Sequence, residues 1–137
     1  MKIMKAGEQD EQIKKFNINE RLKSFRNAFT GIITLLRQEH NARIHLVILV
    51  VVLASGIFLR ISSSDWIAIF FAAGLVFISE CFNTAIEYLS DAVSPEYNEK
   101  IKSAKDVAAA GVLIAAIVSV VIGIIVFLPE IYRLIVK

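Results

Sequence analysis

Three apolar runs, separated by polar stretches, set the strongest limit on how this chain can fold. They cover residues 44–59, 66–78 and 107–128. A helix rises 1.5 Å per residue, so about 20 apolar residues cross the hydrocarbon of a bilayer. The first run is slightly short, and a helix that begins within residues 37–43 would supply the missing length. The pattern predicts an all-α membrane protein with transmembrane helices at 37–59, 66–88 and 104–128.

The composition agrees with one small membrane domain that covers residues 1–137. Hydrophobic residues make up 56% of the chain, which is too apolar for an ordinary soluble fold. Residues 1–17 are polar and mixed in charge, and we expect them to be frayed. The net charge of +2 gives no reason to expect a nucleic-acid partner.

An amphipathic helix is predicted over residues 18–36, before the first span. Lys and Arg occupy much of one side, and Asn17 or Asn19 could cap its start. Such a helix could pack on a soluble core, but the apolar runs that follow favour the membrane interface. Its apolar residues repeat at spacings of three and four, and are Ile18, Leu22, Phe25, Phe29, Ile32, Ile33 and Leu36.

Capping residues and prolines predict where several helices begin and end. Asp65 is a plausible cap for the second span. Ser94, Pro95 and Glu96 follow the order of cap, first helical residue and first-turn acid, which predicts the start of the third helix. Pro129 is predicted to end the third span, and a short tail follows.

The distribution of Lys and Arg predicts the topology. The first 43 residues carry nine of them and the connector 92–106 carries three, whereas the turn 60–65 carries one and the tail after Pro129 two. Basic residues concentrate on the cytoplasmic side of membrane proteins. We therefore expect a multi-pass protein of the cytoplasmic (inner) membrane, with its N-terminus and its second connector in the cytoplasm.

A polar stripe follows the second apolar run, and it consists of Glu80, Asn83, Thr84, Glu87 and Asp91. With 3.6 residues per turn, these side chains share one face of a helix. Ionisable groups at membrane depth are costly unless they are paired or line a polar cavity, so a functional site is the default interpretation. For Asp91 alone, the helix leaving the membrane is a sufficient explanation.

Two further charged groups are expected beside the stripe on the cytoplasmic side. Glu39 and Arg43 are spaced i,i+4 at the start of the first span, where they could simply form an interfacial ion pair. Lys105 and Asp106 lie at the entrance of the third span and could be a helix-end charge pair. The histidines of this region are interpreted as packing or solvent-facing residues rather than ligands, namely His40 and His45.

The residue types of these groups suit phosphate chemistry. Carboxylates and an amide are hard oxygen ligands that Mg²⁺ takes while it keeps waters and phosphates. Lys and Arg suit phosphate oxygens, and a carboxylate free of metal could accept a hydroxyl proton. No glycine-rich phosphate loop is present in the sequence. A non-enzymatic metal or ion carrier and a structural membrane subunit stay open as alternatives.

The stripe and its flanks resemble the small prokaryotic diacylglycerol kinase family, which includes undecaprenol kinases. The resemblance covers about residues 20 to 128, with Ser90 as a departure where the family usually has an aliphatic residue. Three motifs carry it in the right order: Glu39-His-Asn-Ala-Arg43-Ile-His45, Glu80-Cys-Phe-Asn83-Thr84-Ala-Ile-Glu87-Tyr-Leu-Ser-Asp91, and Ser94-Pro-Glu-Tyr-Asn with Ala104-Lys105-Asp106-Val-Ala-Ala-Ala-Gly111.

The resemblance implies a homotrimeric bundle with active sites shared between subunits, and transfer of the ATP γ-phosphate to a lipid hydroxyl with Mg²⁺. The entrance motif looks somewhat more like that of undecaprenol-type members than of diacylglycerol-type members. The roles implied are catalytic base for Glu80, metal ligands for Glu39 and Glu87, an orienting residue for Asn83, and nucleotide contacts for Lys105 and Asp106, with Asp91 and Arg43 at the nucleotide end.

Overall fold

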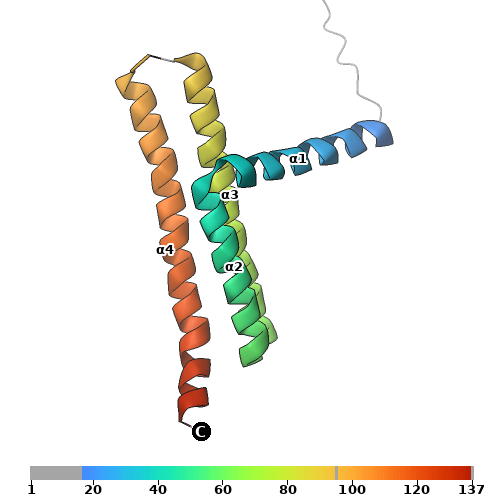
Figure 1. Ribbon diagram of the computed structural model, residues 1–137, viewed down its shortest axis with the longest axis vertical. Coiled ribbons are helices and arrows are strands. Elements are labelled where there is room, and N and C mark those ends of the chain that lie inside the picture. The colour runs from blue at the N-terminus through green and yellow to red at the C-terminus, as the bar shows by residue number, and fades with distance from the viewer. Residues whose placement is uncertain (1–16, 95, 137) are drawn as a thin grey trace, which may run out of the picture.

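The computed structural model describes residues 17–94 and 96–136 as four helices. Helices α3 and α4 form a long antiparallel hairpin, α2 lies along part of it, and α1 runs crosswise to the other three (Figure 1). Three helices, α2 to α4, are long and apolar enough to cross a membrane, as the sequence predicted. The bounds are α1 Ile18–Gln38, α2 His40–Leu59, α3 Ser63–Val93 and α4 Glu99–Ile135.

Glu39 separates α1 from α2 and corrects the prediction for this junction. Its backbone is extended, with φ −92° and ψ 121°, so it ends α1 and caps α2 without belonging to either helix. The expected side-chain pair between Glu39 and Arg43 is therefore not formed; the two residues are joined only by a backbone hydrogen bond of 3.4 Å. The break turns α1 away from the axis of α2.

The start of α3 is capped by a different residue from the one predicted. Ser62, and not Asp65, is the N-cap of α3. The Ser62 hydroxyl accepts the Asp65 backbone N–H at 3.2 Å, and the Asp65 carboxylate accepts the Ser62 backbone N–H at 3.1 Å. This reciprocal capping box satisfies two N–H groups that a single cap would leave unpaired. Asp65 thus acts from the first turn of the helix.

Two further helix ends differ from their predictions. Ser94 is the C-cap of α3, with a backbone N–H bond to the Ser90 carbonyl. The N-cap of α4 is Asn98, whose side chain accepts the N–H groups of Lys100 and Ile101, so this helix begins only at Glu99. Pro95 lies outside the described residues. Pro129 does not end α4, which continues to Ile135; a proline removes only one hydrogen bond, and membrane helices tolerate this loss.

The described helices bury only a small core, centred on Ile61, Ile69 and Val126 near the α2–α3 turn. The α3–α4 contact also contains a polar link, because the Ser119 hydroxyl donates to the Ala72 carbonyl at 3.1 Å. Most large apolar side chains on α2 to α4 face outward. Such a surface is suited to lipid or to further protein, and not to water.

Candidate active site

Glu80 is the centre of the candidate site and the largest fully buried side chain among the described residues, with 1% of its surface exposed. It lies on α3, one turn after the buried Val76. His45 of α2 approaches it, with 3.3 Å between His45 Nε2 and Glu80 Oε1. Burying a carboxylate without compensation costs several kcal/mol of free energy. The contact with His45, and any ligand at the site, would offset part of this cost for Glu80.

Asn83 and Thr84 continue the buried part of the stripe. Asn83 Nδ2 donates to Glu87 Oε1 at 2.9 Å, which fixes both side chains one turn apart. Three buried oxygen atoms accept no hydrogen bond within the described residues, although the first lies 3.3 Å from His45 Nε2: Glu80 Oε1, Asn83 Oδ1 and Thr84 Oγ1. Buried polar atoms in folded proteins nearly always have a partner. Their common position on one face indicates a place where a polar ligand is received.

The three glutamates predicted as base and metal ligands lie within electrostatic range of one another around Glu80, and their roles stay predictions. Glu39 and Glu87 both lie close enough to Glu80 to interact with its charge. Within residues 17–94 and 96–136, no three His, Cys, Asp or Glu side chains are arranged to hold a metal ion by themselves. Mg²⁺ is usually held by one or two carboxylates together with substrate phosphates. The donor set of Glu39 and Glu87 therefore fits Mg²⁺ delivered with a nucleotide.

One ion pair joins α3 and α4 at the end of the hairpin that lies beyond α1, and a second lies within α4. Lys105 Nζ lies 3.0 Å from Asp91 Oδ1, and Lys105 is also within electrostatic reach of Glu87. Asp106 instead pairs with Lys102 at 2.9 Å, one turn earlier on the same helix. These groups are largely exposed. The end of the stripe is thus a charged, water-accessible surface that carries an amine suited to phosphate oxygens.

Two predicted residues take different positions from the buried group. Arg43 is exposed and makes none of the ion pairs found in the described part of the chain. Asp91, at the end of the stripe, is exposed and faces Lys105.

A hydrogen bond joins α1 to the polar part of α3, because the Tyr88 hydroxyl donates to the Gln38 side chain. The spacing of residues in the sequence did not predict this contact.

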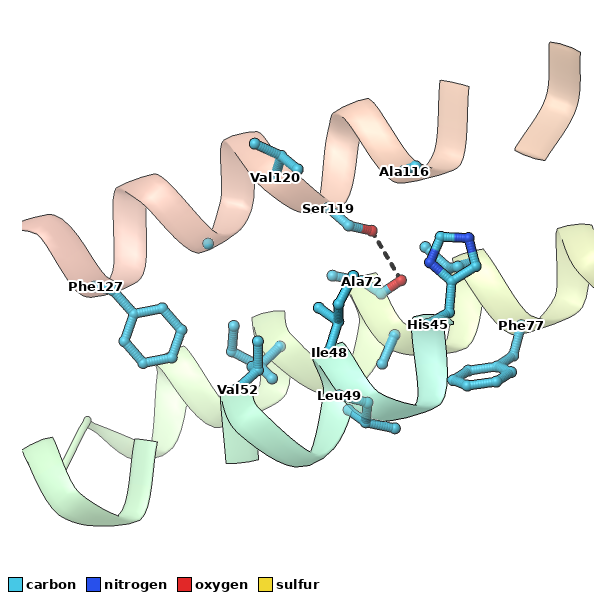
Figure 2. Close-up of a pocket in the computed structure, with 14 residues that line it drawn as sticks. His45, Ile48, Leu49, Val52, Ala72, Phe77, Ala116, Ser119, Val120 and Phe127 are labelled. Carbon is cyan, nitrogen blue, oxygen red and sulfur yellow. Dashed lines mark hydrogen bonds between the residues drawn. The ribbon is translucent and has the colours of Figure 1, made fainter. Parts of the chain in front are cut away.

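An apolar cavity of about 260 Å³ lies between α2, α3 and α4 and reaches the site at one end. Figure 2 shows Phe127 at the far end and His45 at the end nearer the stripe, with Val52, Ile48 and Leu49 of α2 between them. Val76 and Phe77, one turn before Glu80, also line it. His45 is thus the residue that sequence reasoning missed, since only the packing of α2 on α3 shows that it faces both the cavity and a carboxylate.

Fold and site together define a small helical membrane protein whose buried carboxylates lie between an apolar cavity and a charged helix end. The chain belongs to the prokaryotic diacylglycerol kinase family, whose sequence model matches residues 26–127. An undecaprenol kinase of Bacillus subtilis is 36% identical over 113 residues, which cover 82% of this chain and 92% of that protein. A diacylglycerol kinase of Synechocystis sp. is 36% identical over 116 residues, covering 84% of this chain and 66% of that protein.

Family membership confirms the resemblance and the class of activity, that of a lipid kinase. It does not support the carrier or the structural subunit that the sequence left open. The family match also spans the residues of all three motifs, from Glu39 to Gly111.

Proposed function

We propose that this protein is an undecaprenol kinase of the cytoplasmic membrane, which transfers the γ-phosphate of ATP to the terminal hydroxyl of a polyprenol. The observation that carries the proposal is Glu80: a fully buried carboxylate that faces His45, one turn from residues that line an apolar cavity and three turns from the charged pair of Asp91 and Lys105. A lipid alcohol and a cytosolic nucleotide can meet only at such a boundary.

The lining of the cavity supports a polyprenol as the acceptor. Apart from His45 and Ser119 its walls are apolar. A polyprenol carries no polar group besides its hydroxyl, whereas diacylglycerol carries two ester groups next to the hydroxyl, and these need polar partners or water. The cavity is smaller than the roughly 300–1,000 Å³ of pockets that enclose whole ligands, so it suits only the end of a long chain.

The reaction requires a base, and Glu80 supplies it. Its carboxylate accepts the proton of the lipid hydroxyl while the hydroxyl oxygen attacks the γ-phosphorus. The bond between that phosphorus and the oxygen bridging to the β-phosphate breaks, and ADP leaves with the electron pair. Asn83 orients the reacting groups through its free Oδ1, next to Glu87.

The remaining candidate residues bind the nucleotide and its metal ion. Glu39 and Glu87 would hold Mg²⁺, which neutralises phosphate charge when it is bound. Lys105 contacts phosphate oxygens, and Asp91 holds the Lys105 amine in place at 3.0 Å. Asp106 and Arg43 complete the nucleotide end. The outward apolar surfaces of α2 to α4 support assembly as a homotrimer, in which neighbouring subunits complete each site.

The first experiment is a side-by-side assay in detergent micelles with labelled ATP, Mg²⁺ and either undecaprenol or diacylglycerol. We expect a phosphorylated product from undecaprenol. Glu80→Gln should remove most of this activity, by about 100-fold or more, because the amide cannot accept the proton. Glu20→Gln, an exposed glutamate of α1, is the matched control and should match wild type. A product from diacylglycerol alone would overturn the substrate assignment. A wild-type rate in Glu80→Gln would show that Glu80 is not the catalytic base.

A further inference from the structure

We propose that His45 is a positioning residue, which holds the Glu80 carboxylate in the orientation that receives the hydroxyl proton of the lipid. This inference rests on the proposed function. His45 Nε2 lies 3.3 Å from Glu80 Oε1, and within the described residues this is the only ion pair that includes a buried carboxylate. The contact also joins two elements, α2 and α3, that are otherwise packed mainly through apolar side chains.

The position of the imidazole gives it access to both sides of the reaction. The ring lines the end of the apolar cavity (Figure 2), and its Nε2 faces Glu80. A lipid hydroxyl at this end of the cavity would lie beside the ring. A carboxylate whose side chain is free to rotate would present its oxygens in many directions, and the nearby Nε2 restricts that freedom by electrostatic attraction.

Packing alone does not explain a histidine at this position. Ala42, one turn earlier on α2, is fully buried and already gives close packing of this helix end. The other α2 residues that line the cavity are Ile48, Leu49 and Val52. A leucine at position 45 would continue this apolar wall, and it would avoid a partly buried polar ring. What leucine cannot supply is a nitrogen beside Glu80.

The role assigned to His45 is limited to orientation. Glu80 takes the hydroxyl proton, the new bond forms between the lipid oxygen and the γ-phosphorus, and ADP leaves, so His45 exchanges no proton or phosphoryl group. Loss of the ring should therefore reduce kcat and leave the KM for ATP and the requirement for Mg²⁺ unchanged. Misplacement of a reacting group by about 1 Å costs about 100-fold in rate, which sets the upper limit of the effect.

Two substitutions separate the nitrogen from the shape of the wall. His45→Leu keeps an apolar side chain, and we expect kcat for lipid phosphorylation to fall between about 10-fold and 100-fold. His45→Gln places an amide N–H where Nε2 lies, and we expect it to recover most of that loss. His40→Leu is the matched control, because His40 is exposed at the start of α2 and makes no contact with Glu80. Thermal unfolding in detergent checks that each variant is folded.

A spectroscopic measurement tests the contact without any turnover. The chain contains only two histidines, so in the His40→Leu variant, purified with a tag free of histidine, His45 is the only imidazole. We expect its ¹⁵N side-chain signals to move when Glu80→Gln is added and to stay nearly in place with Glu20→Gln. Unmoved signals would overturn the contact, whether or not the lipid assay succeeds.

The kinetic outcomes are equally decisive. An unchanged kcat in His45→Leu overturns the proposal, as does equal loss in His45→Leu and His45→Gln, since the nitrogen would then not matter. A rise in the KM for lipid without a change in kcat also overturns it, because it would assign His45 to the cavity wall. An inactive wild-type protein whose His45 signals do respond to Glu80→Gln would reject the kinase assignment and the positioning role in catalysis together, leaving the contact alone.

Discussion

Glu80 lies where α3 changes from an apolar to a polar helix, and this position explains its surroundings. Val76 is buried one turn before it, and Asn83 and Thr84 are buried on the turn after it. Replacing a buried ion pair, such as that of Glu80 and His45, with well-packed apolar residues often leaves stability unchanged or improves it. A carboxylate kept at this depth, with His45 as its one ion-pair partner in the described residues, is therefore explained by chemistry and not by folding.

Glu87 gives a prediction at the scale of a single residue. Glu87→Gln keeps an oxygen that can accept the Asn83 amide, so the local structure should survive. A neutral amide is a poorer ligand than a carboxylate for a hard cation. We expect the Mg²⁺ concentration for half-maximal activity to rise about tenfold or more, while the KM for lipid stays the same. A titration of activity with Mg²⁺ measures this, with Glu20→Gln as the control, and an unchanged midpoint would exclude Glu87 as a ligand.

The sequence predicted which stripe residues share a face, but not how deeply each one lies. The helical period alone places Glu80 and Asp91 on the same side, although one is fully buried and the other exposed. Depth depends on which helix packs opposite, and α2 covers the stripe only near Glu80. For the same reason the partners of Asp106 and Lys105, and the approach of His45, could not be derived from spacing.

At the scale of elements, the turn between α2 and α3 is built on a close approach of backbone and ring. Gly56 is buried against Trp66, and a Cβ at position 56 would lie 2.9 Å from the Trp66 ring. Arg60 then ends α2 in the left-handed conformation, with φ 54°. The reversal of the chain therefore depends on a missing side chain as well as on the capping box of Ser62 and Asp65.

Gly56→Ala should consequently destabilise the fold. The added methyl group displaces the Trp66 ring, and overpacking of this kind costs about 1–3 kcal/mol. We expect a lower midpoint of thermal unfolding in detergent. Gly31→Ala on α1 is the control, because a Cβ there meets nothing within 4 Å, and alanine is the better helix former. A midpoint for Gly56→Ala equal to that of wild type would show that the ring can move without cost.

The lengths of the apolar runs predicted that the three long helices form, but the sequence did not predict where each helix ends. Asn17 was one of two expected caps for α1, and it is the cap, since its side chain accepts the Asn19 N–H. Ser94 has the chemistry of a cap but is used to end α3, because Asn98 offers the cap for α4. Several residues near a helix end can cap it, and the tertiary contacts of the connector decide between them.

In the whole molecule, α1 separates a charged part of the α3–α4 hairpin from the apolar cavity. The α3–α4 hairpin extends past the crosswise helix α1 (Figure 1), so the ion pairs of Asp91 with Lys105 and of Lys102 with Asp106 lie on one side of α1 and the apolar cavity on the other. A helix with this direction and an apolar face suits the surface of a bilayer. The orientation expected from the distribution of Lys and Arg, and the number of subunits, both stay predictions.

Subunit mixing tests the homotrimer with shared sites. Glu39 lies within electrostatic range of Glu80 of the same chain, so if both serve one site, mixed Glu39→Gln and Glu80→Gln subunits should stay inactive. Arg43 faces outward, and we expect it to serve a neighbouring site. Arg43→Ala mixed with Glu80→Gln should then regain activity, because some sites combine the intact residue of each variant. The measurement is lipid phosphorylation after co-assembly, and no recovery in the second mixture would place Arg43 in the site of its own chain.

The single extended residue between α1 and α2 has a consequence for how the protein meets its membrane. Glu39 is both the residue at which the chain turns from α1 to α2 and a proposed metal ligand. The direction of α1 and the position of the Glu39 carboxylate therefore cannot change independently. A substitution that fused the two helices into one rod would change the direction of α1 and carry the Glu39 carboxylate away from Glu80 in the same movement.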